Sequence, residues 1–189
     1  DLTGDCNGQR QEGFGRFDRN VRRGRRWSAA RAYLHPVMSR ANLDVVCRAF
    51  ATRILFDGRR AVGVEFLRRG RLPQAFADEV ICCGGAINSP QLLQLSGVGP
   101  ASLLRKFDID VVQDLPGVGE NLQDHLEVYV QHACAQPVSL TPNVLWRWRP
   151  WIGLQWLAGA GPGITNHFEA GRFVRSNPDA SYLNLMLHF

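Results

Sequence analysis

Hydrophobic and polar positions alternate most regularly in the middle of the chain, where the pattern is typical of β strands. Runs of β-branched and aromatic residues at Thr52–Phe56 and Ala61–Phe66 flank Asp57-Gly58, a strong signal for a two-residue hairpin turn. A third run follows at Leu72–Ala77 after a further turn. The sequence therefore predicts an antiparallel meander of three strands.

The alternation then gives way to a short, continuous apolar run. Glu79–Cys83 has the composition of a strand buried on both faces of a parallel sheet, and it leads directly into Gly84-Gly85. A compact helix signature follows, in which Ser89 can cap the free amides and Pro90 suits the first helical position. Gly97 can adopt the left-handed conformation that ends a helix.

The remaining elements complete an α/β part followed by an α+β part. Helices are expected at Ser28–Leu34, before Pro36, and at Ala101–Phe107. Further strands are expected at Leu43–Cys47, Ile109–Val112, Val128–Gln131, Asn166–Val174 and Leu183–Phe189. We expect residues 1–125 and 126–189 to belong to two different domains.

The charge distribution is uneven and narrows the classes of partner. The chain has a formal net charge of +5, and residues 1–71 hold 16 arginines against 7 acidic residues. These arginines are scattered through turns and strand edges, without the interleaved stacking aromatics of single-strand nucleic-acid binders. We therefore expect no nucleic-acid partner. A solvated surface, an anionic cofactor or a lipid surface remain as explanations.

Two glycines between a buried strand and a helix form the most informative local feature. They allow a ligand or another backbone to approach closely, and a helix N-terminus attracts anions. This makes a dinucleotide neighbour one interpretation and tight strand–helix packing without a ligand the other. The Gly-x-Gly-x-x-Gly phosphate fingerprint is absent from the sequence.

Other polar residues give weaker indications of chemistry. Asp124 can orient the adjacent His125, although a polar loop held by its own hydrogen bonds explains this pair as well. On a strand, His167 and Glu169 would face the same side, and Glu169 has mainly apolar neighbours. We find neither a nucleophile with its base nor paired carboxylates.

The five cysteines also argue against a metal site. Their spacing matches no metal-ligand pattern, and Cys82-Cys83 is expected to act as a pair of small buried hydrophobic residues. The residues alone therefore predict a two-part protein with a possible anion site, without specifying a reaction.

Several motifs in order resemble those of the glucose–methanol–choline (GMC) oxidoreductase family. The segments that carry the resemblance are Gly24–Leu34, Thr52–Glu65, Gly84–Gly99, Leu115–His125 and Asn166–Phe173. The resemblance implies an FAD-binding domain with a parallel sheet and a substrate domain with an antiparallel sheet.

The same resemblance implies the residues that border FAD. Ala51 corresponds to the residue whose backbone meets the adenine. Gly84, Gly85 and Ala86 lie where the family chain passes close to the flavin nucleotide. The loop at residues 120–125 falls in the flavin-side region, which adds Asn121 and His125 as weaker cofactor candidates.

The implied reaction is the oxidation of an alcohol to an aldehyde by hydride transfer to the flavin. Glu169 matches the position at which choline-oxidising members place a carboxylate against the trimethylammonium group, with His167 beside it. Attraction between unit charges about 4 Å apart is worth roughly 4 kcal/mol at an effective dielectric of 20, enough to select a cation. Aliphatic, aromatic or polyether alcohols are the alternative substrates.

The resemblance also implies what this chain lacks. The phosphate fingerprint is expected before Asp1 and the catalytic histidine beyond Phe189, so no catalytic residue is assigned and the isolated chain is expected to be inactive. The small alcohol is the expected partner, and the electron acceptor is left open. The protein is expected in the cytoplasm or peripherally on the inner face of a membrane, or in mitochondria if it is eukaryotic.

Overall fold

The computed structural model describes residues 2–133, 135–136, 145–164, 168 and 170–188, and divides the chain into two compact units. One unit is continuous and runs from Asp44 to Val130. The other combines the described parts of Asp1–Leu43 and Gln131–Phe189. The assignment of residues 1–125 and 126–189 to two domains stays a prediction.

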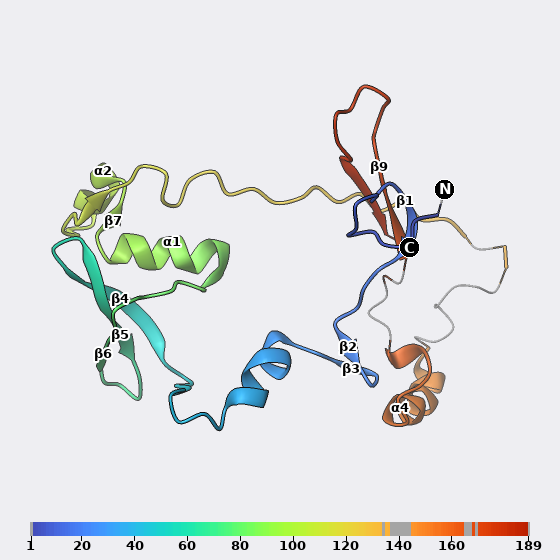
Figure 1. Ribbon diagram of the computed structural model, residues 1–189, viewed down its shortest axis with the longest axis horizontal. Helices are drawn as coiled ribbons and strands as arrows, with labels where there is room; N and C mark the ends of the chain where they lie inside the picture. The colour runs from blue at the N-terminus through green and yellow to red at the C-terminus, as the bar shows by residue number, and fades with distance from the viewer. Residues whose placement is uncertain (1, 134, 137–144, 165–167, 169, 189) are drawn as a thin grey trace. The chain divides into compact units, whose positions relative to one another are not determined.

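The continuous unit contains a three-stranded antiparallel sheet in the order β4-β5-β6 (Figure 1). Its strands are β4 (Phe50–Asp57), β5 (Arg60–Leu67) and β6 (Gln74–Phe76). The hairpin predicted at Asp57-Gly58 is confirmed, with Asp57 paired to Arg60 and Gly58 at a φ of 57°. Glycine reaches this left-handed conformation without steric cost.

Two helices and a pair of short strands complete this unit. Helix α1 spans Gly85–Leu95 and α2 spans Ala101–Lys106, while β7 (Val98–Gly99) runs parallel to β8 (Gln113–Asp114). The Ala101 amide at the start of α2 donates a hydrogen bond to Asp114 Oδ1 at 2.9 Å. This bond satisfies one of the amides that a helix N-terminus leaves without a partner.

The small core of this unit is formed by residues of β4, β7 and α2 and of the end of α1. Ile54, Val98, Ala101 and Leu104 are buried, and so is the hydroxyl-bearing Ser96. The Ile54 amide donates to Ser96 Oγ at 2.8 Å, and Ser96 Oγ donates to the Leu92 carbonyl at 2.6 Å. Ser96 therefore connects the end of α1 to the middle of β4.

The C-terminal end predicted for α1 is confirmed, whereas the predicted N-terminal start is wrong. Gly97 has a φ of 88°, which confirms the predicted left-handed stop. However, α1 already begins at Gly85, so Ser89 is not its N-cap and Pro90 lies inside the helix. The Ser89 hydroxyl instead accepts a hydrogen bond from the Gly84 amide at 2.9 Å, which tightens the turn before the helix.

The predicted buried strand at Glu79–Cys83 is wrong for this structure. The segment is irregular, Ile81 is 75% exposed, and Cys82 and Cys83 are exposed. A strand exists only through hydrogen bonds to a neighbouring strand, and the described part of the chain pairs nothing with this segment. The cysteine side chains therefore have nothing to bury them.

Three other strand predictions are also corrected. Leu43–Cys47 and Val128–Gln131 are irregular and largely exposed, and Ile109–Val112 precedes the strand β8 without forming one. Each has a β-favouring composition. Composition alone does not supply the partner that a strand requires.

The other unit is built on a second antiparallel sheet, in the order β1-β9-β10. Its strands are β1 (Gly13–Arg16), β9 (Ala170–Val174) and β10 (Leu185–His188). Both of the last two predicted segments thus contain a strand, β9 and β10. Residues more than 150 positions apart in sequence pair here, since Gly13 lies opposite Phe173.

Short elements accompany this second sheet. They are the hairpin β2 (Val21–Arg22) and β3 (Arg25–Arg26), the helical turns η1 (Ala30–Leu34), η2 (His35–Val37), η3 (Trp146–Trp148) and η4 (Pro162–Ile164), and helix α4 (Arg149–Leu157). The helix predicted after Ser28 is present as η1, and Ser28 Oγ accepts a hydrogen bond from the Arg31 amide at 3.4 Å. Pro36 lies within η2 and does not end the helical segment.

Replacement of Ser96 by alanine is expected to lower the free energy of unfolding by about 1–3 kcal/mol, because the buried Ile54 amide loses its acceptor. Urea unfolding followed by circular dichroism measures this change. Ser102→Ala, on the exposed side of α2, is the matched control and should leave the midpoint almost unchanged. Equal midpoints for the two variants would show that the Ser96 bridge contributes nothing.

Candidate functional site

The N-terminal turn of α1 presents backbone amides with no capping side chain. Gly84 precedes the helix without a side-chain cap, and the first turn contains no acidic residue. Gly84, Gly85 and Ala86 are all exposed. Because the first amides of a helix have no acceptor within it, this end carries a partial positive charge suited to an anion.

Gly85 gives this turn an open backbone. Its φ is 86°, a conformation that residues with a side chain rarely adopt, and a Cβ added there would meet no atom within 4 Å. The space beside Gly85 is thus open, not filled by tight packing. A Cβ on Gly84, in contrast, would lie 3.2 Å from Asn88 Cβ and 3.3 Å from Ser89 Oγ, so one glycine of the pair is packed and the other is open. The approach of a ligand at this turn stays a prediction.

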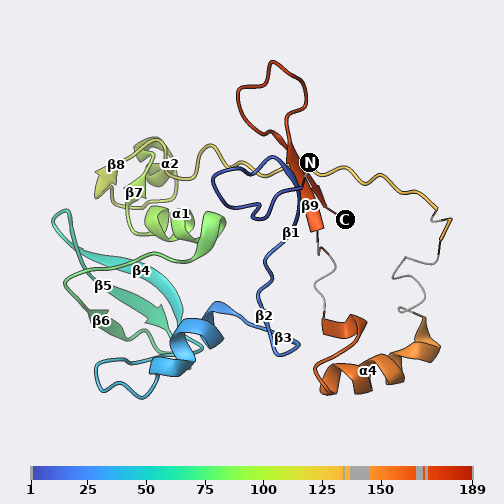
Figure 2. The same ribbon diagram turned by 45° about the vertical axis from the view of Figure 1, so that its right-hand side comes forward.

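Ala51 lies at the start of β4, opposite Phe66 of β5, and is exposed. Helix α1 packs along β4, and both run in the same general direction (Figures 1 and 2). The beginning of α1 and the beginning of β4 therefore lie toward the same end of this unit. In this way the structure brings Ala51 to the same end as Gly84, Gly85 and Ala86.

The two weaker cofactor candidates lie in an irregular, exposed segment. Asn121 has a φ of 56°, and the His125 side chain is 84% exposed. Its Nδ1 lies 3.2 Å from Asp124 Oδ1, and its amide donates to the same oxygen at 2.9 Å. Asp124 and His125 thus form a local contact in solvent, and a role of His125 toward the cofactor stays a prediction.

Glu169 and His167 lie outside the described residues, but Phe168 between them borders a cavity of about 330 Å³ in the other unit. The cavity is lined by Asn7, Phe17, Asp18, Phe168, Phe173, Met186 and His188. Three phenylalanine rings, one imidazole and one carboxylate therefore line a small space that is open to solvent.

The aromatic rings of this cavity contact one another edge to face. The His188 ring centroid lies 5.0 Å from that of Phe168 and 5.5 Å from that of Phe17, at interplanar angles of 68° and 60°. Phe17 in turn lies 6.3 Å from Phe173. Such arrangements leave π faces available, and a π face attracts an organic cation.

Sheet register explains why these rings gather on one face. Phe173 pairs with Met186, and Gly171 pairs with His188, so alternate residues of β9 and β10 point to the same side. A Cβ on Gly171 would collide with the ring of Phe17. The absence of a side chain at Gly171 therefore allows Phe17 to pack over the strand.

The sequence analysis predicted none of the residues that line this cavity as part of a site. It named only His167 and Glu169, which flank Phe168 in the sequence. The lining residues come from four separate segments, and no local pattern connects Phe17 with Phe168. The only available signal was the apolar surroundings of Glu169. Within the described residues, no group of three potential ligands could hold a metal ion, and no helix is long and apolar enough to cross a bilayer.

Comparison with known proteins identifies the chain. Residues 1–127 match the family model described as GMC oxidoreductase. The chain is 58% identical over 188 residues to oxygen-dependent choline dehydrogenase of Staphylococcus haemolyticus, covering 99% of this chain and 33% of that protein. The Staphylococcus xylosus protein of the same name is also 58% identical, with 99% and 34% covered. The chain thus spans about one third of the length of these relatives.

Solved structures agree in fold. Pyridoxine 4-oxidase from Mesorbium loti superposes with a TM-score of 0.71 at 28% identity, over 93% of this chain and 30% of that one. Formate oxidase from Aspergillus oryzae gives a TM-score of 0.73 at 26% identity, over 87% and 29%. With a family model that matches two thirds of its residues and the same family motifs in order, this chain belongs to the GMC oxidoreductase family.

Proposed function

We propose that the protein containing this chain is an FAD-dependent dehydrogenase that oxidises choline to betaine aldehyde. The observation that carries the proposal is the 58% identity, over 99% of this chain, to proteins named choline dehydrogenase. In this reaction the carbinol carbon loses a hydride and the hydroxyl group loses a proton. The products are the aldehyde and the reduced cofactor.

The start of α1 fits a dinucleotide. Gly85 and Ala86 would hold its phosphates through amides that no side chain caps, Gly84 would lie beside them with its own amide bonded to Ser89 Oγ, and the open space at Gly85 admits a close approach. Ala51, exposed at the same end of the unit, would border the adenine, and Asn121 and His125 are further candidates. FAD, when bound, supplies the group that accepts the hydride.

The aromatic cavity fits the quaternary ammonium group of choline. Phe17, Phe168 and Phe173 would contact the methyl groups, and Asp18 brings a negative charge. Cation–π attraction is worth about 0.5–2 kcal/mol, depending on how far the cation is desolvated. Glu169 directly follows Phe168 in the sequence, and His167 directly precedes it. We therefore include Glu169, with His167, as a second carboxylate near this cavity in the proposal.

The proton and electron acceptors are separate parts of the proposal. We assign no residue of this chain as the base that takes the hydroxyl proton, and expect that base in the rest of the protein. The relatives are oxygen-dependent choline dehydrogenases by name, so dioxygen is the first electron acceptor to test. Oxidation of an uncharged alcohol is the competing function, and the charge-based experiments below separate the two.

Replacement of Ala86 by aspartate in the full-length protein is expected to weaken FAD binding by at least about tenfold, since a carboxylate in this turn repels the phosphates. Flavin absorbance per protein and titration of the apoprotein measure this effect. Ala86→Asn is the matched neutral control, with nearly the same size. Aspartate also suits a helix N-terminus, so thermal stability should not fall. Unchanged flavin content in the aspartate variant would rule out a phosphate site here.

Replacement of Glu169 by glutamine is expected to lower kcat/KM for choline by at least about tenfold, because the cation loses a charged partner. The same variant should barely affect 3,3-dimethylbutan-1-ol, in which carbon replaces the quaternary nitrogen. Asp18→Asn tests the second carboxylate in the same way.

Asp179→Asn, on the exposed connection between β9 and β10, is the control and should leave kcat/KM unchanged for both alcohols. Steady-state kinetics with both alcohols provide the measurement. If the unaltered enzyme oxidised both alcohols equally well, the choline assignment would be wrong even though the FAD proposal could stand.

A further inference from the structure

An extra residue interrupts β4 immediately after Ala51. Ala51 pairs with Phe66 of β5, but the next pair along the two strands joins Arg53 to Glu65. Thr52 therefore has no partner of its own in β5, which is the arrangement of a β-bulge. Bulges bend a strand and change the direction of the residues beside them, and they are frequent next to functional sites.

One carboxylate on the neighbouring strand holds this bulge. Successive residues of a regular strand point to opposite faces of the sheet, yet Thr52 and Arg53 both reach the Glu65 side chain. Thr52 Oγ1 lies 3.0 Å from Glu65 Oε1, and Arg53 Nη2 lies 3.5 Å from Glu65 Oε2. The Thr52 hydroxyl is also 3.1 Å from the Glu65 carbonyl oxygen, so both of its acceptors belong to this residue. The Glu65 side chain is only 17% exposed.

The shift in register is confined to the middle of the hairpin. Leu55 pairs with Gly63, whereas Phe56 already pairs with Ala61, so Val62 is an extra residue on β5 that restores the register. The pairs at the two ends of β4 therefore belong to the same register. The bulge is thus a local feature of the strand beside Ala51, and the hairpin turn does not require it.

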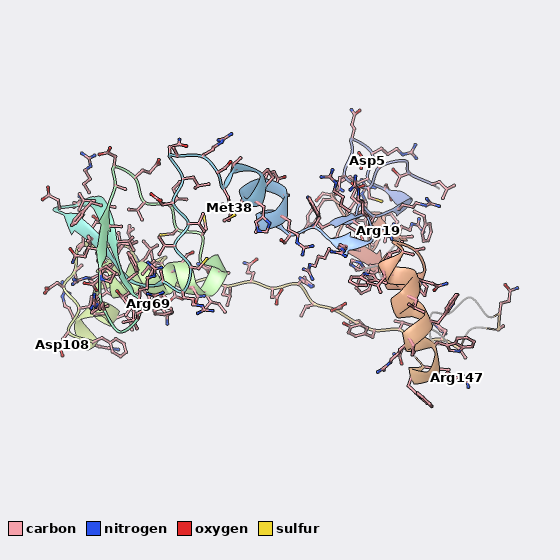
Figure 3. All side chains as sticks on the ribbon, turned by 90° about the horizontal axis from the view of Figure 1, so that it is seen from below. Asp5, Arg19, Met38, Arg69, Asp108 and Arg147 are labelled. Atoms are coloured by element: carbon pink, nitrogen blue, oxygen red, sulfur yellow. The ribbon has the colours of Figure 1, made fainter. Side chains whose placement is uncertain are left out.

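Two contacts determine where Ala51 lies relative to α1. The Ile54 amide donates to Ser96 Oγ at 2.8 Å, which holds α1 against β4 two residues beyond the bulge. The bulge then sets the direction in which β4 continues from Ile54 back to Ala51. Figure 3 labels Arg69, in the turn that follows β5 at this end of the hairpin. The position of Ala51 therefore depends on the Thr52–Glu65 contact as well as on Ser96.

We propose that Thr52 and Glu65 are positioning residues that orient the Ala51 backbone toward the adenine of FAD. This inference rests on the proposed function, in which Ala51 borders the adenine. A peptide group offers one N–H donor and one carbonyl acceptor, and adenine presents its amino donor beside a ring-nitrogen acceptor. Both hydrogen bonds form only when the peptide group has one orientation, and a bulge held from the neighbouring strand supplies a fixed one.

The test is titration of the full-length apoprotein with FAD and with flavin hypoxanthine dinucleotide, followed by flavin fluorescence. In the second dinucleotide a carbonyl oxygen replaces the adenine amino group. The unaltered protein should prefer FAD by at least about tenfold, because the analogue presents an acceptor where the peptide carbonyl needs a donor.

Two variants remove the contact from its two sides. Thr52→Val keeps the branched shape without the hydroxyl, and should weaken FAD binding by at least about fivefold and reduce the preference to about twofold or less. Glu65→Met removes the carboxylate from a side chain of similar length, and should reduce the preference in the same direction. A loss of stability that weakens both dinucleotides equally leaves their ratio unchanged, and thermal melting of each variant checks folding.

Thr52→Ser is the matched control, because it keeps the hydroxyl and should keep the preference for FAD. Asp78→Asn removes another ion pair of 3.5 Å, to Arg60 on the exposed part of the same sheet, and should bind both dinucleotides as the unaltered protein does.

The inference is overturned if a folded Thr52→Val or Glu65→Met protein keeps the full preference for FAD, or if Thr52→Ser loses it as valine does. Should one of the first two variants fail to fold, the other decides. Equal binding of both dinucleotides by the unaltered protein would also overturn it, although the FAD proposal would stand. Failure of the unaltered protein to bind either dinucleotide would refute the proposed function itself, and this inference with it.

Discussion

The bridge through Ser96 is the interaction on which the continuous unit depends. One hydroxyl group accepts from the Ile54 amide in β4 and donates to the Leu92 carbonyl in α1, and the first of these bonds is buried while the second is partly buried. Such a pair fixes the helix along the strand more specifically than apolar contact alone. The N-terminal turn of α1 lies at the other end of the helix, where the space beside Gly85 is open.

The sequence predicted well those features that are determined locally. The Asp57-Gly58 hairpin and the left-handed Gly97 follow from backbone geometry that few residues tolerate, so they were recognised without knowledge of the remaining fold. The strand predicted at Glu79–Cys83 was wrong because a strand forms only when a second segment supplies the hydrogen-bond partners. The apolar composition of this segment is typical of a strand with neighbours on both sides, and among the described residues no strand pairs with it.

The aromatic cavity illustrates the same distinction at the level of function. Phe17 and Asp18 reach it from beyond β1, whereas Phe173 and His188 reach it from β9 and β10. Only the pairing of β1 with β9 brings these segments together, and no spacing rule relates residues so far apart. Similarly, the start of α1 was misplaced by five residues because Ser89 resembles a cap, although its hydroxyl accepts a hydrogen bond from the Gly84 amide.

Substrate choice in this family must arise from such side chains. Proteins named pyridoxine 4-oxidase and formate oxidase share this chain's backbone arrangement, with TM-scores of 0.71 and 0.73, at identities of only 28% and 26%. A common backbone therefore accommodates quite different substrates, and the fold alone cannot specify one. What can discriminate a cation from a neutral alcohol is the chemistry lining a cavity. Under the proposed function, three phenylalanine rings and the Asp18 carboxylate would attract a quaternary ammonium group and would give a neutral isostere no electrostatic gain.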